Sequence, residues 1–440
     1  MSGKIAQTRK ILKAAIKEIC SISWMFVRNP EKDFTRNRKI SFRDILLFFL
    51  CKEGGNHTTE LFRYFRLAPD SASISAFIQQ RDKILPEAFI TLFHLFTRKA
   101  CPQKLYKGLQ LLAVDGSDIQ ISTNPNDTNS YFPGSSGQKP YNLLHLNALY
   151  DLNADVYIDA DIGGKRCCTE VRSLCKMVDR SSVERALVIA DRGYESYNLM
   201  AHIQEKHWFF LIRVKETHSI ASGLNLPDTP EFDFPIQLSL CRRQTKQALS
   251  LFQNRNRFRF LPRNSTFDYL PTENRKHDPV LFYDLSFRLV RIRLSDDSFE
   301  LLLTNLPKDD FPMNELKSLY HLRWGIETSF RSLKYTVGLL HFHAKKAENI
   351  LKEVFARLAL YNFSSLIALH STVPDSKRKS PCKVKFSAAV HLCRQFILGN
   401  VSPPVLEALL LRQVSSIRPG RNFPRGSSLR KPVSFSYRIA

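Results

Sequence analysis

Two short apolar runs that each end in an aspartate constrain the fold of this chain more than any other feature. Residues 111–114 precede Asp115, and residues 187–190 precede Asp191. Apolar runs of this length next to glycine are typical of buried strands, and open sheets present ligand-binding groups at the carboxyl ends of their strands. An aspartate after a strand is also common in ordinary turns. Taken alone, each aspartate is therefore as consistent with an ordinary turn as with a functional site.

The hydrophobic pattern around these runs alternates between strand and helix. We expect strands at residues 111–122, 143–151, 156–162, 186–190, 208–214 and 301–304, and helices at 170–179 and 197–205. Three consecutive strands, then alternating helices and strands, then a helix that carries Glu327 is the element order of an RNase H-like α/β fold.

A helix over residues 320–334 would place four polar side chains on one stripe. At about 100° per residue, the members of this stripe lie within about 60° of one another: Tyr320, Arg323, Glu327 and Lys334. The apolar residues form a separate stripe that can be buried while the polar one faces outward: Leu322, Ile326, Phe330, Leu333 and Val337. A carboxylate flanked by an aromatic ring and two cations suits a metal ion beside a phosphate. Arg323 and Glu327 stand at i and i+4, which is also the spacing of an ordinary exposed salt bridge, worth about 0.5 kcal/mol.

The ordered trio Asp115, Asp191 and Glu327 resembles the DDE triad of bacterial insertion-sequence transposases. The spacing of the polar stripe is similar to the signature of one large group of them, the Tyr-Arg-Glu-Lys group. Supporting matches are Asp-Arg-Gly-Tyr at 191–194, Leu-Leu-Leu-Thr at 301–304 and Arg-Pro-Gly-Arg-Asn-Phe-Pro-Arg at 418–425. The likeness extends from about residue 35 to the C-terminus, and it too implies an RNase H-like, retroviral-integrase-like catalytic core.

The resemblance implies a metal-dependent reaction on DNA. Asp115, Asp191 and Glu327 would be the catalytic residues and would hold two Mg²⁺ ions, for which Mn²⁺ can substitute, with Asp115 bridging both. Carboxylates are the hard oxygen ligands that these ions prefer. Two metal ions about 3.5 to 4 Å apart suit phosphodiester cleavage. Water would free the transposon 3′-OH, which then becomes the nucleophile of strand transfer, in this group sometimes after forming a hairpin end.

The same resemblance assigns DNA contacts. The residues expected to grip phosphates near the transposon 5′ end are Tyr320, Arg323 and Lys334, with Arg331 as a further contact on the same helix. Members of the group also flip a base onto an aromatic residue just ahead of the Leu-Leu-Leu-Thr strand. Here Glu300 takes that position, which leaves Phe299 and Trp324 as the candidates for stacking.

Charge independently favours a polyanionic partner. The chain has 65 Lys and Arg against 41 Asp and Glu, a net charge of +24, which suits double-stranded DNA. No apolar run approaches the roughly 18 to 20 residues of a membrane span, and the N-terminal segment resembles no signal peptide, so we expect a cytoplasmic, nucleoid-associated protein. The nine cysteines include no Cys-x-x-Cys pair and are expected to be reduced. His341 and His343 are a weak candidate for metal ligation.

We expect five regions along the chain. They are a helical N-terminal DNA-binding domain (1–105), the first part of the catalytic core (106–216), a β-rich insertion (217–308), the second part of the core (309–370) and a basic C-terminal region (371–440). Between residues 242 and 263 the insertion holds seven cations and no acid. A strand there would place Arg255, Arg257 and Arg259 on one face, either to follow DNA or as a merely solvated surface.

The function expected from these features is cut-and-paste transposition. The partners would be the terminal inverted repeats of the element and its target DNA, bound by at least a homodimer because two ends must be paired. One alternative is a catalytically inactive DNA-binding relative that inhibits transposition, although all three carboxylates are present. Another is an RNase H-like nuclease that cuts without joining, against which the Tyr-Arg-Glu-Lys spacing argues.

Overall fold

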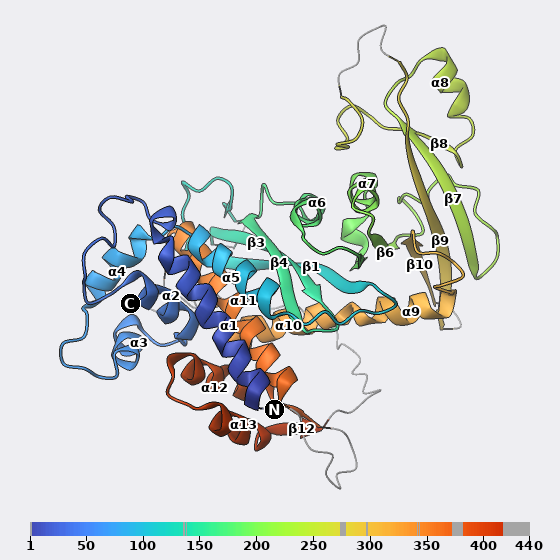
Figure 1. Ribbon diagram of the computed structural model, residues 1–440. Helices are drawn as coiled ribbons and strands as arrows, with labels where there is room; N and C mark the ends of the chain where they lie inside the picture. Colours follow the sequence, from blue (N-terminus) through green and yellow to red (C-terminus); the bar gives the residue numbers. More distant parts are fainter. Residues whose placement is uncertain are drawn as a thin grey trace.

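The protein is a mixed α/β structure in which helices flank one large sheet (Figure 1). This computed structural model describes residues 2–134, 137, 139–272, 279–295, 298–340, 342, 344–371 and 382–416. The tail after residue 416, with the run at 418–425, lies outside the described residues, as do His341 and His343. No helix of the described chain is long and apolar enough to cross a membrane.

The sheet has ten strands among the described residues. In sheet order they are β2 (Tyr131–Phe132), β3 (Tyr141–Asp151), β1 (Gln110–Ile121), β5 (Ala186–Ala190), β6 (Phe209–Val214), β10 (Ser298–Thr304), β9 (Tyr283–Ser295), β7 (Phe232–Cys241) and β8 (Phe258–Phe260), with β4 (Val156–Gly164) beside β3 off this path. The strands predicted between residues 111 and 214 are confirmed to within two residues at each end. β1, β5 and β6 run parallel, whereas β3 is antiparallel to β1.

Helices cover both faces of the sheet, which explains why its central strands are apolar on both sides. On one face, α6 (Glu170–Arg180) and α7 (Tyr197–Glu205) pack on alternate β1 residues such as Leu112 and Val114. On the other face, Ala113 and Ile119 belong to a cluster with Ile326 and Phe330 of α10 (Trp324–Ser332). In Figure 1, α9 (Met313–Leu322) and α10 lie along one side of the sheet, and α6 and α7 along the other.

The N-terminal helices and the helices after residue 382 wrap around one long buried helix, α11 (Ala347–His370). The elements in contact with α11 or with each other are α1 (Ser2–Ser21), α2 (Phe42–Cys51), α3 (His57–Tyr64), α4 (Ile74–Lys83), α5 (Glu87–Ala100), α12 (Phe386–Leu398) and α13 (Pro403–Leu411). α2 begins at a capping box between Ser41 and Asp44. One apolar cluster includes residues of α1, α5, α11 and β4, so these helices and the sheet share a core.

A buried ion pair joins α2 to α11. Lys52 and Glu353 are both almost fully inaccessible to solvent, and the Lys52 ammonium donates to Glu353 Oε2. Burial lowers the pKa of Lys52 to about 8, although Glu353 opposes this change. Arg357, also on α11, donates to the backbone oxygen of Lys52 (2.7 Å). The attachment of the N-terminal helices therefore depends in part on buried charges that compensate one another across the contact between α2 and α11.

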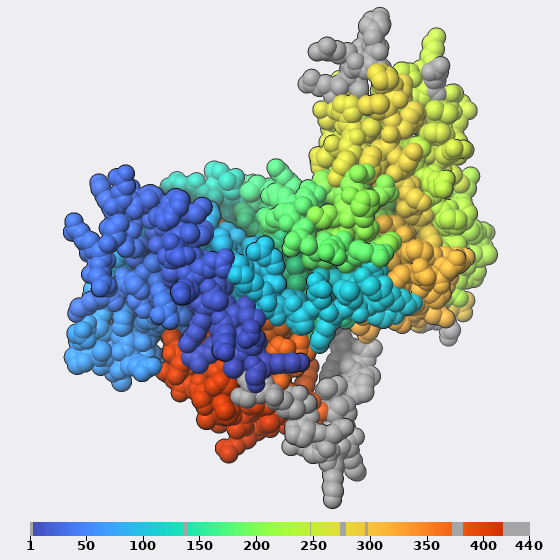
Figure 2. Space-filling view, in the orientation of Figure 1, coloured from blue at the N-terminus to red at the C-terminus, as the bar shows by residue number. Residues whose placement is uncertain are grey.

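The insertion extends the sheet and projects as a lobe from the body of the molecule (Figure 2). Its strand β10 pairs with β6, and β9 and β7 continue outward from β10. The expected strand through Arg255, Arg257 and Arg259 is wrong in extent, because only Phe258–Phe260 forms a strand. Residues 254–257 form a turn closed by the Arg257 N–H donating to Asn254 O (3.1 Å), which interrupts the strict alternation of side chains.

Glu353→Gln should destabilise the protein by about 3 to 5 kcal/mol, because Lys52 is left as an uncompensated buried cation. The matched control is Glu348→Gln on the same helix, whose partner Arg28 is half exposed and which should cost under about 1 kcal/mol. Urea denaturation followed by circular dichroism measures both. Equal effects of the two substitutions would contradict a special role for the buried pair.

Candidate active site

Asp115 and Asp191 are brought to one region of the sheet because the parallel pairing of two strands ends just before them. β1 and β5 pair from Gln110 with Ala186 through Ala113 with Ile189. Each aspartate stands two residues beyond the last of these pairs, Asp115 still within β1 and Asp191 directly after β5. The expectation that an acidic residue follows a buried strand is confirmed for Asp191, whereas Asp115 lies inside β1, at the point where β1 stops pairing with β5.

Glu327 approaches this edge from α10, but the helix that carries it differs from the one predicted. α9 ends at Leu322 and α10 begins at Trp324, with Arg323 at the junction, and residues 333–337 form a π-helix. Leu322 is 44% exposed, so its predicted burial is wrong. The division at Arg323 separates Leu322 from the buried stripe of α10, to which Ile326 and Phe330 do belong.

The polar stripe faces the ends of the strands rather than solvent. Tyr320 is 5% exposed and Arg323 is 4% exposed, which corrects the expectation of an outward-facing stripe. The Tyr320 hydroxyl donates to Asp191 Oδ1 (3.3 Å), and Lys334 Nζ donates to the backbone oxygen of Asp118 (3.3 Å). An exposed surface salt bridge therefore does not describe this helix, even though Arg323 and Glu327 are paired.

The Arg323 guanidinium is the electrostatic centre of the site. Its Nη2 donates to Glu327 Oε1 at 2.9 Å. Burial lowers the pKa of Arg323, but Tyr320 and the three carboxylates of Asp191, Glu327 and Asp115 raise it above its usual value. One buried cation thus interacts with all three members of the predicted triad.

Asp115 is held in a state that favours binding a proton or a cation. Burial raises the pKa of its carboxyl to about 6, against the Gly116 N–H and Arg323, which lower it, and together with Glu327, which raises it. The Gly116 N–H donates to Asp115 Oδ1 at 2.9 Å. A buried carboxylate whose ionisation is disfavoured gains when positive charge is placed beside it.

The donor set of this site fits a hard divalent cation. Three carboxylates are the ligands that Mg²⁺ and Mn²⁺ prefer, and Asp115, Asp191 and Glu327 could supply them. Among the described residues, no three His, Cys, Asp or Glu side chains are already close enough to share one ion. The carboxylates are instead spread around Arg323 and would have to turn toward one another on binding.

The two candidates for base stacking are placed differently. Trp324 is 41% exposed, next to the site, with Arg323 5.2 Å from its ring centre. Phe299 lies on the opposite face of β10 from Glu300, with Arg291 4.5 Å and Arg293 5.6 Å from its ring centre. The structure therefore brings Trp324, and not Phe299, toward the triad.

The remaining predicted DNA contacts lie at the surface. Arg331 is exposed on α10. Arg255 and Arg257 are exposed just before β8, which lies toward the outer part of the insertion (Figure 1). Arg259 is partly buried, and its Nη2 donates to Ser222 O at 2.8 Å, so part of its role is to hold the loop before β7.

Two further charged residues, Arg213 and Glu300, lie at the site, and neither was predicted from the sequence to interact with the triad. Arg213 of β6 lies 3.3 Å from Glu300 Oε1 and 4.0 Å from Asp191 Oδ1. Burial raises the pKa of Glu300, and Asp191 adds to this while Arg213 opposes it. The sequence does contain a signal for these two residues, because each is a charged residue inside or beside an apolar strand. Burying a charge costs free energy unless the charge is paired.

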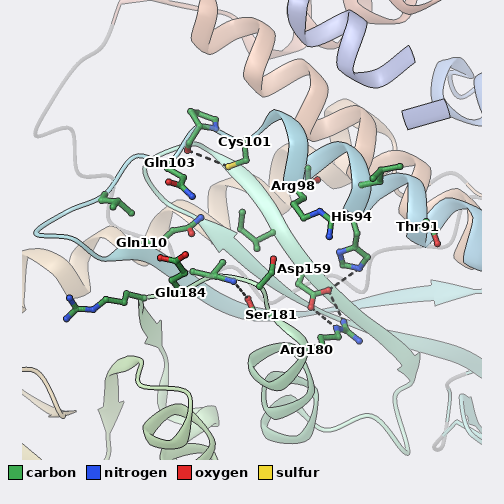
Figure 3. A pocket seen from close by; sticks show the side chains of 18 of the residues that line it. Thr91, His94, Arg98, Cys101, Gln103, Gln110, Asp159, Arg180, Ser181 and Glu184 are labelled. Carbon is green, nitrogen blue, oxygen red and sulfur yellow. Dashed lines mark hydrogen bonds and ion pairs between the residues drawn. The ribbon is translucent and has the colours of Figure 1, made fainter. Parts of the chain in front are cut away.

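A cavity of about 780 Å³ lies elsewhere, at the start of β1 rather than beyond its end (Figure 3). Gln110, the first residue of β1, lines it together with α5 and the segment before β5. Part of its polar wall is a network in which Arg180 Nε donates to Asp159 Oδ2 (2.7 Å) and His94 lies 3.4 Å from Asp159 Oδ1. None of the three predicted catalytic carboxylates lines this cavity, so it is not the candidate active site.

The fold and the site define an α/β protein with two aspartates just beyond the paired part of two adjacent parallel strands and a glutamate on a helix beside them. The chain belongs to the transposase DDE domain family, because residues 106–363, more than half of its length, match that family. The resemblance to DDE transposases of insertion sequences is thereby confirmed at the level of the family.

Individual relatives are distant. The chain is 22% identical over 303 residues to transposase InsG of insertion sequence element IS4 from Escherichia coli (strain K12), covering 66% of this chain and 59% of that protein. It is 21% identical over 265 residues to the transposase of insertion sequence element IS231B from Bacillus thuringiensis subsp. berliner, covering 55% and 53%. The match thus spans little more than half the length of these relatives.

A solved structure of the piggyBac transposase synaptic complex with hairpin DNA has 11% sequence identity to this chain. The alignment has a TM-score of 0.44 and covers 88% of this chain and 80% of that one. An overlap this loose does not by itself establish a shared fold.

Asp115→Asn should stabilise the metal-free protein at pH 7 by on the order of 1 to 2 kcal/mol, because it removes a buried charge but keeps the acceptor for the Gly116 N–H. The folded-state pKa of Asp115, about 6, lies above the ordinary 3.8. Stability of the unsubstituted protein should therefore fall as pH rises from about 4 to about 6, and the variant should lack this fall.

The control for this prediction is Asp118→Asn, which should change stability in the opposite direction. Burial raises the pKa of Asp118, but hydrogen bonds from His145 and Lys165 outweigh it and hold the pKa below its usual value. The ionised Asp118 therefore stabilises the fold above pH 4. Thermal melting in EDTA across this pH range measures both variants, and destabilisation by Asp115→Asn at pH 7 would refute the assignment.

Proposed function

We propose that the protein is a transposase that moves an insertion sequence by cut-and-paste transposition, with an RNase H-like catalytic core. The observation that carries this proposal is the arrangement of Asp115, Asp191 and Glu327 around the buried Arg323 in a chain of the DDE family. Hydrolysis of a phosphodiester at one transposon end would release a 3′-OH. That hydroxyl would then attack either the opposite strand, giving a hairpin, or target DNA.

The three carboxylates are proposed to hold two Mg²⁺ or Mn²⁺ ions. When bound, two such metal ions would activate an oxygen nucleophile and compensate the charge that develops on the phosphate and the leaving oxygen. The residues around the carboxylates control their orientation. Tyr320 donates to Asp191, Arg323 donates to Glu327, and the Gly116 N–H donates to Asp115.

The cations of the site are proposed to bind DNA phosphate. Lys334 is partly buried, and burial lowers its pKa although Asp118 and Asp115 oppose this change. A DNA phosphate placed near Lys334 and Arg323 would accept hydrogen bonds from both cations. For Lys334 it would also compensate the positive charge that burial disfavours. Trp324, exposed beside Arg323, is the aromatic surface proposed for a displaced base.

The substrate proposed on these grounds is double-stranded DNA with inverted repeats at the ends of the element. A net charge of +24 favours contact with many phosphates. The exposed Arg255 and Arg257 place part of this charge on the projecting insertion. Pairing two transposon ends requires at least a homodimer in the complex with DNA.

Asp115→Asn, Asp191→Asn and Glu327→Gln should each reduce Mg²⁺-dependent cleavage of a labelled transposon end by several orders of magnitude while leaving end binding nearly unchanged. The reason is that carboxylates serve the chemistry, whereas phosphate contacts supply the affinity. Asp309→Asn, an exposed acid on the loop before α9, is the control and should cleave normally. Substantial cleavage by any triad variant removes that residue from the site, and cleavage without joining by the unsubstituted protein would favour the nuclease alternative.

Reversing Arg255 and Arg257 to Glu should flatten the salt dependence of DNA binding. Each lost phosphate contact reduces the slope of log K against log salt by about 0.9, so the double variant should lose up to about two units. Arg259 is left intact because it also holds Ser222. The control reverses Arg185 and Lys308, two exposed cations just before β5 and after β10, which changes net charge equally, and an equal effect of both pairs would show that the insertion is not a specific DNA surface.

A further inference from the structure

The sheet opens between the two segments that carry Asp115 and Asp191. β1 continues past Asp115 in the company of β3, whereas the chain after β5 turns into a short 3₁₀ helix, Arg192–Tyr194. Beyond Ala113 and Ile189 the two segments are no longer paired. The separation between the two aspartates is therefore not fixed by backbone hydrogen bonds and must be set by something else.

The carboxylate of Glu170 occupies this opening. Glu170 is the first residue of α6 and comes from the face of the sheet opposite α10. A Cβ on Gly116 would lie 2.9 Å from Glu170 Oε1, and a Cβ on Gly193 would lie 2.5 Å from Glu170 Oε2. One carboxylate thus touches the residue after Asp115 and the second residue after Asp191, and only glycine leaves room for it at both places.

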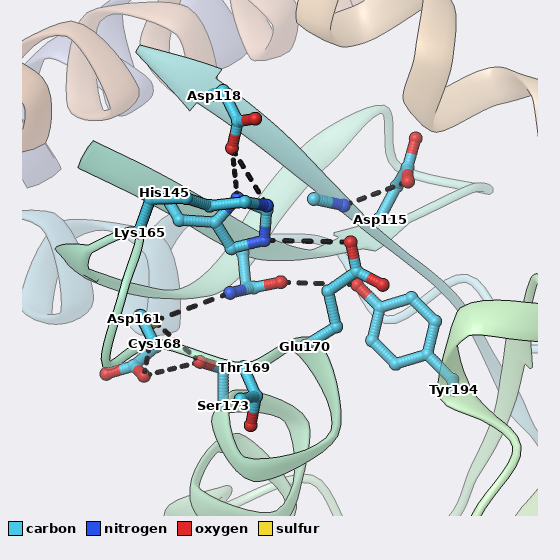
Figure 4. Close-up of polar contacts among 12 residues, drawn as sticks. Asp115, Asp118, His145, Asp161, Lys165, Cys168, Thr169, Glu170, Ser173 and Tyr194 are labelled. Carbon is cyan, nitrogen blue, oxygen red and sulfur yellow. Dashed lines mark hydrogen bonds and ion pairs between the residues drawn. The ribbon is translucent and has the colours of Figure 1, made fainter. Parts of the chain in front are cut away.

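Glu170 is oriented by a buried histidine. The His145 side chain is 3% exposed, and its Nε2 lies 3.6 Å from Glu170 Oε1 without forming a hydrogen bond to any other described residue. The other ring nitrogen, Nδ1, bonds to Asp118 Oδ1 at 2.5 Å, and Lys165 Nζ lies 3.1 Å from the same oxygen. Figure 4 shows this chain of contacts running from Asp118 through His145 to Glu170, beside Asp115 and Tyr194.

The negative charge of Glu170 is placed behind the proposed metal ligand Asp115. Glu170 Oε1 lies against Gly116, the residue that follows Asp115 in β1. The pKa of Glu170 itself is lowered, first by its interaction with His145, so Glu170 is ionised at neutral pH. A fixed anion behind Asp115 increases the gain from placing a divalent cation in front of it.

We propose that Glu170 is a positioning residue of the active site, held by His145, which sets the separation of the Asp115 and Asp191 segments and strengthens divalent-cation binding. This inference rests on the proposed function of the triad. Glu170 acts through the two aspartates, reaching their neighbours Gly116 and Gly193 from behind the sheet.

The test is a Mn²⁺ titration of the full-length protein without DNA, measured by the electron paramagnetic resonance signal of free Mn²⁺. Glu170→Gln, which keeps the side-chain shape but removes the charge, should weaken Mn²⁺ binding by about tenfold or more, as substitutions of groups that orient metal ligands do. Gly193→Ala keeps the charge but displaces the carboxylate, and it should weaken binding as well. Glu184→Gln, an exposed acid just before β5, is the control and should bind normally.

A double variant separates positioning from general damage. If the Gly193→Ala effect is transmitted through Glu170, then Glu170→Gln combined with Gly193→Ala should bind Mn²⁺ about as well as the weaker single variant, whereas independent damage would add. Thermal melting of each variant confirms that it is folded. If Glu170→Gln is poorly folded, Glu170→Asp, which keeps the charge on a shorter side chain, should restore folding and part of the affinity.

The outcomes distinguish this inference from the function on which it rests. Normal Mn²⁺ affinity in folded Glu170→Gln, with binding abolished by Asp115→Asn, would overturn the role of Glu170 and leave the triad intact. Unchanged binding in Asp115→Asn itself would overturn the metal site and both proposals with it. Weaker binding in Glu170→Gln and Gly193→Ala without additivity is the result that we expect.

Discussion

Three carboxylates cannot surround one partly buried region of the protein unless their charges are compensated, and in this protein the Arg323 guanidinium provides the compensation. Asp115, Asp191 and Glu327 all act on Arg323, which is almost completely buried at the junction of α9 and α10. The arrangement of the surrounding elements follows from this requirement. The helix must bring Arg323 to the ends of β1 and β5, and its apolar residues, among them Ile326, fix it against the sheet.

The sheet with α6, and the helices packed around α11, support the position of Arg323 and the three carboxylates from different sides. Parallel pairing of β1 with β5 places two aspartates at one edge, while α6 covers the far face and brings Glu170 into the gap that the pairing leaves. α11 follows α10 and is buried along most of its length, tied to the N-terminal helices through Lys52 and Glu353. The site is thus assembled from segments about 200 residues apart in sequence, between Asp115 and Glu327, and its geometry depends on tertiary packing.

The parts of this structure that could be predicted from sequence are those that depend on local patterns. The apolar runs before Asp115 and Asp191 are strands, because continuous apolar sequence of that length is buried on both faces of a sheet. The helical wheel correctly grouped Tyr320 with Arg323 and Glu327, but it could not show that this stripe faces the sheet or that the helix divides at Arg323. Burial of the stripe depends on where the helix docks, which its own sequence does not contain.

Other features of the site lay beyond sequence reasoning for the same reason. Glu170 and Glu300 belong to separate elements, and only the packing of α6 and the pairing of β10 with β6 bring them to the triad. The side on which Phe299 lies is set by the register of β10 against β9, where a bulge occurs between Ser298 and Phe299. A shift of one residue in register exchanges the two faces of a strand, so proximity to the active site could not be assigned from position in the chain.

The central claim is that Asp115, Asp191 and Glu327 form one metal-binding active site around Arg323. The most direct measurement is a crystal structure of the protein bound to a transposon end and soaked in Mn²⁺, with anomalous diffraction recorded for manganese. The account predicts two anomalous peaks about 3.5 to 4 Å apart, in contact with these three carboxylates and with the scissile phosphate. Manganese peaks elsewhere in the DNA-bound protein, with none at the three carboxylates, would contradict it.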